Sequence, residues 1–98
     1  MHYLLFYDYV EDYVPKRAPL RAAHLELARK SFQRGEMVLG GAYAEPDHGA
    51  VIVFRGESPA VAENFAKADP YVTSGLVTRW EVKKWLTVIG DGATMPQL

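Results

Sequence analysis

The chain has 98 residues, 49% of them hydrophobic and 23% charged, with a net charge of −1 and no cysteine. This length fits one domain, and the near-neutral charge excludes a broad electrostatic attraction for nucleic acid or an anionic membrane. The absence of cysteine excludes disulfides, thiolate nucleophiles and cysteine-ligated metal sites, so any chemistry depends on histidine, carboxylates, hydroxyls and arginine.

No segment approaches the roughly 18 consecutive apolar residues of a membrane span. The start, Met1-His2-Tyr3, enters a strand-like run without the basic and apolar regions of a signal peptide. We therefore expect a cytoplasmic protein without membrane or nucleic-acid partners.

The first third of the chain predicts a strand, a loop and a helix. Residues 2–10 are rich in aromatic and β-favouring types and are apolar on both alternating sets, which is typical of a strand covered on both faces. Residues 11–16 are polar and contain Pro15, which indicates a loop. Pro19 favours a helix start and Gly35 a helix stop, so we expect a helix over residues 20–34.

The rest of the chain predicts a hairpin, a second helix and a last strand. Residues 37–44 and 50–55 form the hairpin, with turn residues between them and with Gly40-Gly41 marking a bulge or a close approach to the backbone. A helix over residues 59–68 ends before Asp69-Pro70, and a strand follows over residues 76–86. Residues 90–98 have little to pack against and are expected to be a mobile tail.

This order of strand, helix, strand, strand, helix, strand predicts a single ferredoxin-like α+β domain over residues 1–89, with an antiparallel sheet and two helices on one face. The first and third strands are apolar on both sides, so something must cover the second face. A homodimer that packs sheet against sheet meets this need.

Polar residues interrupt the predicted core side of the helix over residues 20–34. At 100° per residue, one arc of this helix holds Leu20, Arg21, His24, Leu25, Leu27, Ala28, Ser31 and Phe32. His24 lies near the middle of the arc, where its protonation depends on the environment. It is a candidate catalytic residue, and the alternative is a core histidine bonded to a carbonyl.

Asp69 is the second candidate, because a carboxylate at a helix C-terminus is disfavoured by the helix dipole. A contact with Arg17, Arg21 or His24 explains its position, and the alternative is a turn with Pro70-Tyr71. The two arginines are four residues apart and are alternatively a solvated basic edge. We predict no metal site, since His2, His24 and His48 lack a ligand spacing.

Several of these residues belong to motifs of a known family. Lys16-Arg17, Arg21-Ala22-Ala23-His24-Leu25, Gly40-Gly41 and Ala68-Asp69-Pro70-Tyr71-Val72 followed by Gly75 resemble the YCII-related family over about Tyr3 to Trp85. The resemblance implies a ferredoxin-like dimeric α/β barrel and an active site whose central members are a histidine and an aspartate. These correspond to His24 and Asp69.

A carboxylate bonded to one imidazole nitrogen fixes the tautomer and makes the other nitrogen a better base. We therefore expect His24 and Asp69 to act as a catalytic pair in cofactor-independent proton transfer, of lyase or isomerase type, on a small aromatic or carbonyl-bearing acid. The expected substrate-binding residues are Arg17 and Arg21 as cations, Tyr71 as a donor, and Tyr7 and Trp80 as an aromatic wall. The alternatives are a non-catalytic small-ligand binding protein and an oxygenase with His24 as a heme ligand.

Overall fold

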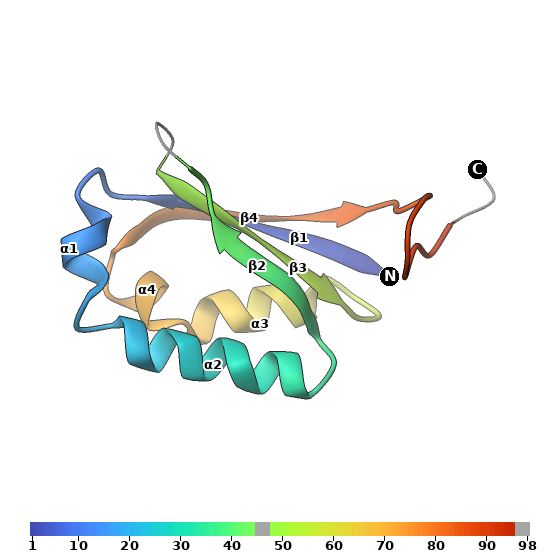
Figure 1. Cartoon of the computed structure of the whole chain (residues 1–98), viewed down its shortest axis with the longest axis horizontal. Helices are drawn as coiled ribbons and strands as arrows, with labels where there is room; N and C mark the ends of the chain where they lie inside the picture. The colour runs from blue at the N-terminus through green and yellow to red at the C-terminus, as the bar shows by residue number, and fades with distance from the viewer. Residues whose placement is uncertain (45–47, 96–98) are drawn as a thin grey trace.

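The computed structural model describes residues 1–44 and 48–95 (Figure 1). Most of the predicted hairpin turn and the last three residues of the predicted tail lie outside this part. The elements, in chain order, are β1 (His2–Tyr9), α1 (Tyr13–Arg17), α2 (Arg21–Gln33), β2 (Met37–Ala42), β3 (Gly49–Arg55), α3 (Ala60–Ala68), α4 (Pro70–Thr73) and β4 (Val77–Trp85).

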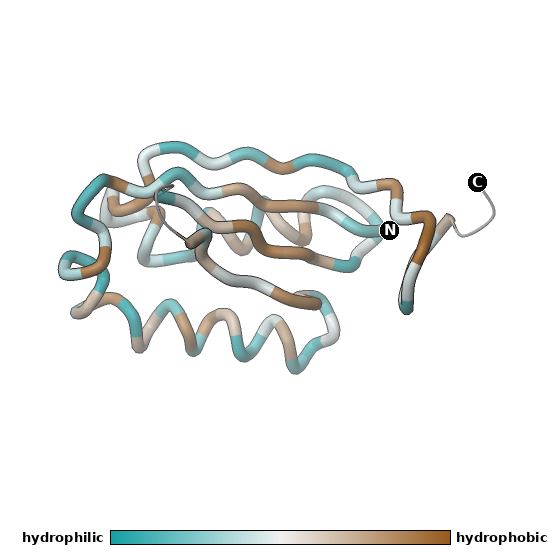
Figure 2. The backbone as a smooth tube through the Cα atoms, turned by 45° about the horizontal axis from the view of Figure 1, so that its top comes forward, coloured by the Kyte–Doolittle hydropathy of each residue, from teal (hydrophilic) through white to brown (hydrophobic). Residues whose placement is uncertain are grey.

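The four strands form one antiparallel sheet in the order β2-β3-β1-β4, with the helices on one face (Figure 1). The fold is therefore ferredoxin-like α+β, as the element order predicted. The two strands that are apolar on both faces, β1 and β3, are the central ones, and Figure 2 shows hydrophobic residues along both of them. The strands that the sequence pattern predicted to be covered on both faces are thus the two in the middle of the sheet.

The core lies between the sheet and the helices. In the register of the central pair, Leu5 is opposite Ile52 and Tyr3 opposite Phe54, and all four side chains are buried in the core cluster. Phe65 of α3 reaches this layer, with its ring centroid 5.3 Å from that of Phe54. Burying each large apolar side chain contributes about 1.5–3 kcal/mol, so these residues hold the helices on the sheet.

The opposite face of the sheet is apolar and half-buried. It carries Leu4 and Phe6 of β1, which are opposite Val53 and Val51 of β3. No helix of the described chain covers this face (Figure 1). The homodimer through this surface therefore stays a prediction.

The structure differs from the prediction at α1, which lies where we expected a loop over residues 11–16. A five-residue helix is unstable by itself, so tertiary contacts must hold it. The Tyr13 ring stacks on the ring of Tyr9 at 4.5 Å, and the Arg17 guanidinium lies 5.6 Å from the Tyr13 ring centroid. Such contacts leave no periodic signal in so short a segment.

The helix over residues 20–34 was predicted almost to its ends, but some of the residues that we expected to face the core are exposed. Phe32 and Leu25 are 62% and 47% exposed, and Ser31 is the only fully buried residue of α2. Periodicity shows which residues share a side, and this side borders a cavity as well as the core.

Beyond β4 the chain returns toward Thr87, whose carbonyl accepts a hydrogen bond from the Met95 N–H at 2.8 Å. The mobility expected for residues 90–98 stays a prediction. Within the described ranges, no helix has the length and hydrophobicity needed to cross a membrane.

Candidate active site

His24 and Asp69, which are 45 residues apart in sequence, meet between α2 and α4. The Nδ1 atom of His24 lies 2.9 Å from each carboxylate oxygen of Asp69. The Asp69 side chain has no exposed surface, whereas that of His24 keeps 14% of its surface exposed. The buried carboxylate therefore contacts Nδ1 on the interior side of the imidazole, while part of the ring is accessible to solvent.

The position of Asp69 follows from local sequence. Pro70 disfavours helical geometry at the residue before it, so α3 ends and Asp69 is extended, with φ −74° and ψ 123°. In this geometry Asp69 is the N-cap of α4, and its Oδ1 accepts a hydrogen bond from the Tyr71 N–H at 3.0 Å. The turn with Pro70-Tyr71 and the contact with His24, which we had treated as alternatives, occur together.

Tyr7 supplies the remaining partner of this buried carboxylate. Its hydroxyl donates to Oδ2 of Asp69 at 2.7 Å. Burial, followed by the negative charge of Asp69, raises the pKa of Tyr7, so the phenol stays protonated and keeps donating. Three donors thus compensate for the desolvation of Asp69, as a buried charge requires.

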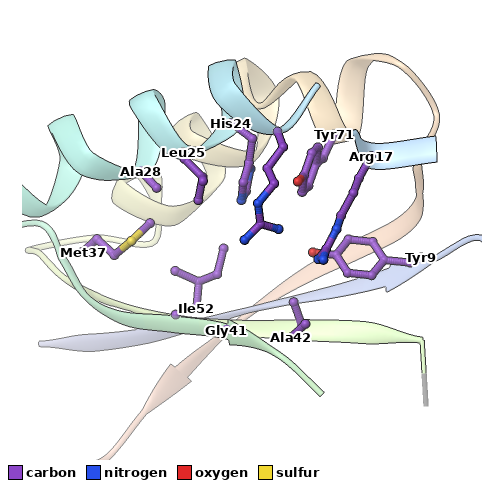
Figure 3. Close-up of a pocket in the computed structure, with 13 residues that line it drawn as sticks. Tyr9, Arg17, His24, Leu25, Ala28, Met37, Gly41, Ala42, Ile52 and Tyr71 are labelled. Atoms are coloured by element: carbon purple, nitrogen blue, oxygen red, sulfur yellow. The ribbon is translucent and has the colours of Figure 1, made fainter. Parts of the chain in front are cut away.

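A cavity of about 310 Å³ opens in front of His24, between α2, β2 and the end of β1 (Figure 3). It is lined by Tyr9, Arg17, Arg21, His24, Leu25, Ala28, Met37, Gly40, Gly41, Ala42, Ala50, Ile52 and Tyr71. Four of the seven predicted site residues are therefore in the lining: Arg17, Arg21, His24 and Tyr71. Asp69 lies behind them.

The two residues expected to form an aromatic wall are not in the lining. Tyr7 is 1% exposed and lies behind Asp69, where it acts as a hydrogen-bond donor. Trp80 of β4 is opposite Tyr7 in the sheet and packs against the core.

Tyr71 forms the aromatic surface next to His24 instead. The two rings stack with centroids 3.8 Å apart and planes 6° apart. The Tyr71 hydroxyl is buried and has no hydrogen-bond partner among the residues that the structure describes. Burial raises the pKa of Tyr71 although Arg21 and Arg17 oppose this shift, so the hydroxyl stays a donor at neutral pH.

Sequence reasoning missed Tyr9 and Met37 as lining residues. Burial also raises the pKa of Tyr9, which lies edge-on to Tyr71 with ring centroids 6.1 Å apart. Gly40 gave a usable signal, because we expected a close approach there. A Cβ atom at this position would lie 3.3 Å from Cγ2 of Ile52, beside the cavity.

Within residues 1–44 and 48–95, no three histidine or acidic side chains gather to hold a metal ion. His2 has a separate environment, since its Nδ1 lies 2.9 Å from the Thr87 hydroxyl and its ring packs edge-on to Trp85. The site is therefore a hydrogen-bonded pair of a histidine and an aspartate beside a cavity lined by two arginines.

Comparison with solved structures supports the fold. The structure is similar to 5-chloro-2-hydroxyhydroquinone dehydrochlorinase (TftG) from Burkholderia phenoliruptrix AC1100 in complex with 2,5-dihydroxybenzoquinone, with a TM-score of 0.76, 20% identity, and coverage of 89% of this chain and 95% of the other. It also resembles protein Atu4242 from Agrobacterium tumefaciens, with a TM-score of 0.59, 17% identity, and coverage of 97% and 99%. At these identities the likeness concerns the fold.

Among curated proteins, no sequence matches this chain. The sequence profile of the YCII-related domain, in contrast, matches residues 1–86, a range that includes every strand and helix of the described chain. The protein therefore belongs to the YCII-related family.

Proposed function

We propose that this protein is a cofactor-independent enzyme that uses His24 and Asp69 for general acid/base proton transfer on a small organic acid, in a lyase or isomerase type of reaction. The observation that carries the proposal is the 2.9 Å contact of His24 Nδ1 with the buried Asp69, on a ring that faces the cavity (Figure 3). This contact keeps one proton on Nδ1 and leaves Nε2 as the atom that accepts or donates the second.

The proposed step begins when Nε2 of His24 accepts a proton from a carbon or oxygen of the substrate. The electron pair of the broken bond forms a new double bond, and a leaving group departs with its bonding pair or the proton returns at another atom. Asp69 stabilises the imidazolium that forms meanwhile. Negative charge that develops on a substrate oxygen is stabilised by Arg21, Arg17 and the Tyr71 hydroxyl.

The lining of the cavity supports an anionic substrate. It contains two arginines and no carboxylate, since Asp69 lies behind His24. A cavity of roughly 150 Å³ accommodates benzene, so about 310 Å³ holds a substituted ring. TftG acts on 5-chloro-2-hydroxyhydroquinone as a dehydrochlorinase, which supports a lyase-type reaction on a ring with acidic oxygens.

The test measures the tautomer of His24 and the conversion of substrate by variants of the pair. In wild-type protein, a ¹⁵N-detected NMR spectrum should show His24 with its proton on Nδ1, and incubation with a panel of halogenated and hydroxylated aromatic acids should yield product. His24→Asn and Asp69→Asn should both abolish conversion while the fold is retained. Arg29→Met, on the solvent side of the same helix, is the control. Conversion by His24→Asn at the wild-type rate would exclude the proposal.

The second candidate function is non-catalytic binding of a small anion. The unpartnered Tyr71 hydroxyl and the two arginines favour it, because they suit capture of a ligand without any bond being broken. The two functions differ in what is recovered after a long incubation: an unchanged ligand that raises the melting temperature indicates binding, and a converted one indicates catalysis.

The functional unit in this proposal is a homodimer. The half-buried apolar face of β1 and β3 supports it, since an uncovered apolar sheet surface favours association.

A further inference from the structure

We propose that the cavity selects an amphipathic anion, with its charged oxygens held near α1 and an apolar arm directed toward Met37. This inference rests on the site of the proposed function and assigns the ligand a class and an orientation. It follows from the unequal distribution of polar groups along the cavity, which Figure 3 shows from side to side.

The end near α1 gathers the hydrogen-bond donors. Arg17 comes from α1, Arg21 is the first residue of α2, and the Tyr71 and Tyr9 rings stand beside them (Figure 3). The Tyr71 side chain is 3% exposed, and its hydroxyl has no partner within the described chain. A buried hydroxyl without a hydrogen bond is destabilising, so a ligand oxygen at this end satisfies it.

The other end of the cavity has no polar side chain. The cavity-lining residues of α2 are three to four positions apart, so they follow one another along the same side of the helix. In order, they are Arg21, then His24 and Leu25, then Ala28. Seven residues of helix correspond to about 10 Å, which separates the charged end from Ala28. Met37 and Ile52 lie across the cavity from Ala28, so the far end is apolar (Figure 3).

Gly40 keeps the apolar end open. It is opposite Ile52 in the β2–β3 register, so a side chain at position 40 would be on the same face of the sheet as Ile52. Its Cβ would already lie 3.3 Å from Ile52 Cγ2, and larger groups would stand in the cavity. The ligand thus has room for a substituent where a side chain is missing.

His24 lies between the two ends. A ligand that spans about 10 Å, with a carboxylate or phenolate at one end and an alkyl or aryl group at the other, presents its middle atoms to Nε2. A compact inorganic anion such as phosphate fills only the charged end.

Isothermal titration calorimetry of the wild-type protein with benzoate, 4-ethylbenzoate, 4-ethylbenzamide and phosphate tests this orientation. Each buried methylene strengthens binding by about fourfold, so 4-ethylbenzoate, which has two more carbons, should bind roughly 15-fold more tightly than benzoate. The neutral amide and phosphate should bind at least tenfold more weakly than 4-ethylbenzoate.

Two pairs of variants test which end of the cavity binds the ethyl group and which binds the carboxylate. Ala28→Leu should remove the preference for the ethyl group and keep benzoate affinity, whereas Ala22→Leu, on the exposed side of the same helix, should keep both. Arg21→Met should weaken both benzoates at least tenfold, and Arg29→Met should not.

Equal affinity for the two benzoates, an ethyl preference that survives Ala28→Leu, or no binding of either benzoate would overturn the proposal. These binding measurements need no turnover, so the orientation proposal can be refuted independently of the acid/base proposal. The acid/base proposal is tested by the tautomer of His24 and by the His24→Asn variant.

Discussion

Replacing Tyr7 by phenylalanine removes one hydrogen bond from the buried carboxylate of Asp69 and changes little else. The lost bond is short, 2.7 Å, and both side chains are almost wholly buried, at 1% and 0% exposed. A hydrogen bond to a charged group contributes about 1.5–3 kcal/mol, and water does not replace it at a buried site. We therefore expect Tyr7→Phe to lower the free energy of unfolding by about 2 kcal/mol, or the melting temperature by roughly 10 °C.

The assay is urea unfolding followed by circular dichroism, with calorimetry for the melting temperature. Tyr3→Phe is the matched control: Tyr3 is buried on the same face of β1, and its hydroxyl makes no hydrogen bond within the described residues. The His24 tautomer should persist in Tyr7→Phe, because Asp69 still faces Nδ1. If both variants lose the same free energy within about 0.5 kcal/mol, Tyr7 does not stabilise Asp69 and the reasoning is refuted.

Three further predictions follow from individual residues. Burial raises the pKa of Tyr7 above its ordinary 10.0, so above about pH 10 the native state keeps a proton that the unfolded state loses. The free energy of unfolding of the wild type should therefore fall with pH more steeply than that of Tyr7→Phe, by roughly 1.4 kcal/mol per pH unit. Equal dependence on pH in the two proteins would contradict this. Gly75 has a φ of +86°, so Gly75→Ala should lower the free energy of unfolding by about 1 kcal/mol in urea titrations, and an unchanged midpoint would be inconsistent with a strained backbone. The dimer should appear as twice the 11.0 kDa chain mass in light scattering at micromolar concentration and be lost in Phe6→Glu, whereas a monomeric wild type would argue against it.

The sequence was informative wherever local chemistry decides the structure. Apolar residues on both alternating sets of β1 and β3 indicated strands covered on both faces, and these two strands are the central ones of the sheet. Pro70 ended α3 at the predicted residue, and Gly35 follows α2 with a φ of +81°. These features depend on hydrophobic periodicity and on the backbone freedom of proline and glycine, which one sequence contains.

Only the tertiary structure decided how the candidate site is assembled. The sequence singled out His24 and Asp69, but the contact between them depends on how α2 and α4 pack over the sheet. Tyr7 was expected in a ligand wall and instead donates to Asp69, because its position on β1 brings it beneath the carboxylate. Tyr71 stacks on His24 since Asp69, as the N-cap, fixes the start of α4.

The exposed side chains of α2 show the same limit. Helical spacing grouped Leu25 and Phe32 with His24, yet spacing contains no information on whether that side meets a core or a cavity. The sequence by itself thus predicted the four strands, the two longer helices and their order, and it singled out His24 and Asp69, whereas the short helices α1 and α4 were not predicted. The cavity, its charged end and its apolar end depend on the distance between α2 and β2, which is set by contacts between residues far apart in the chain.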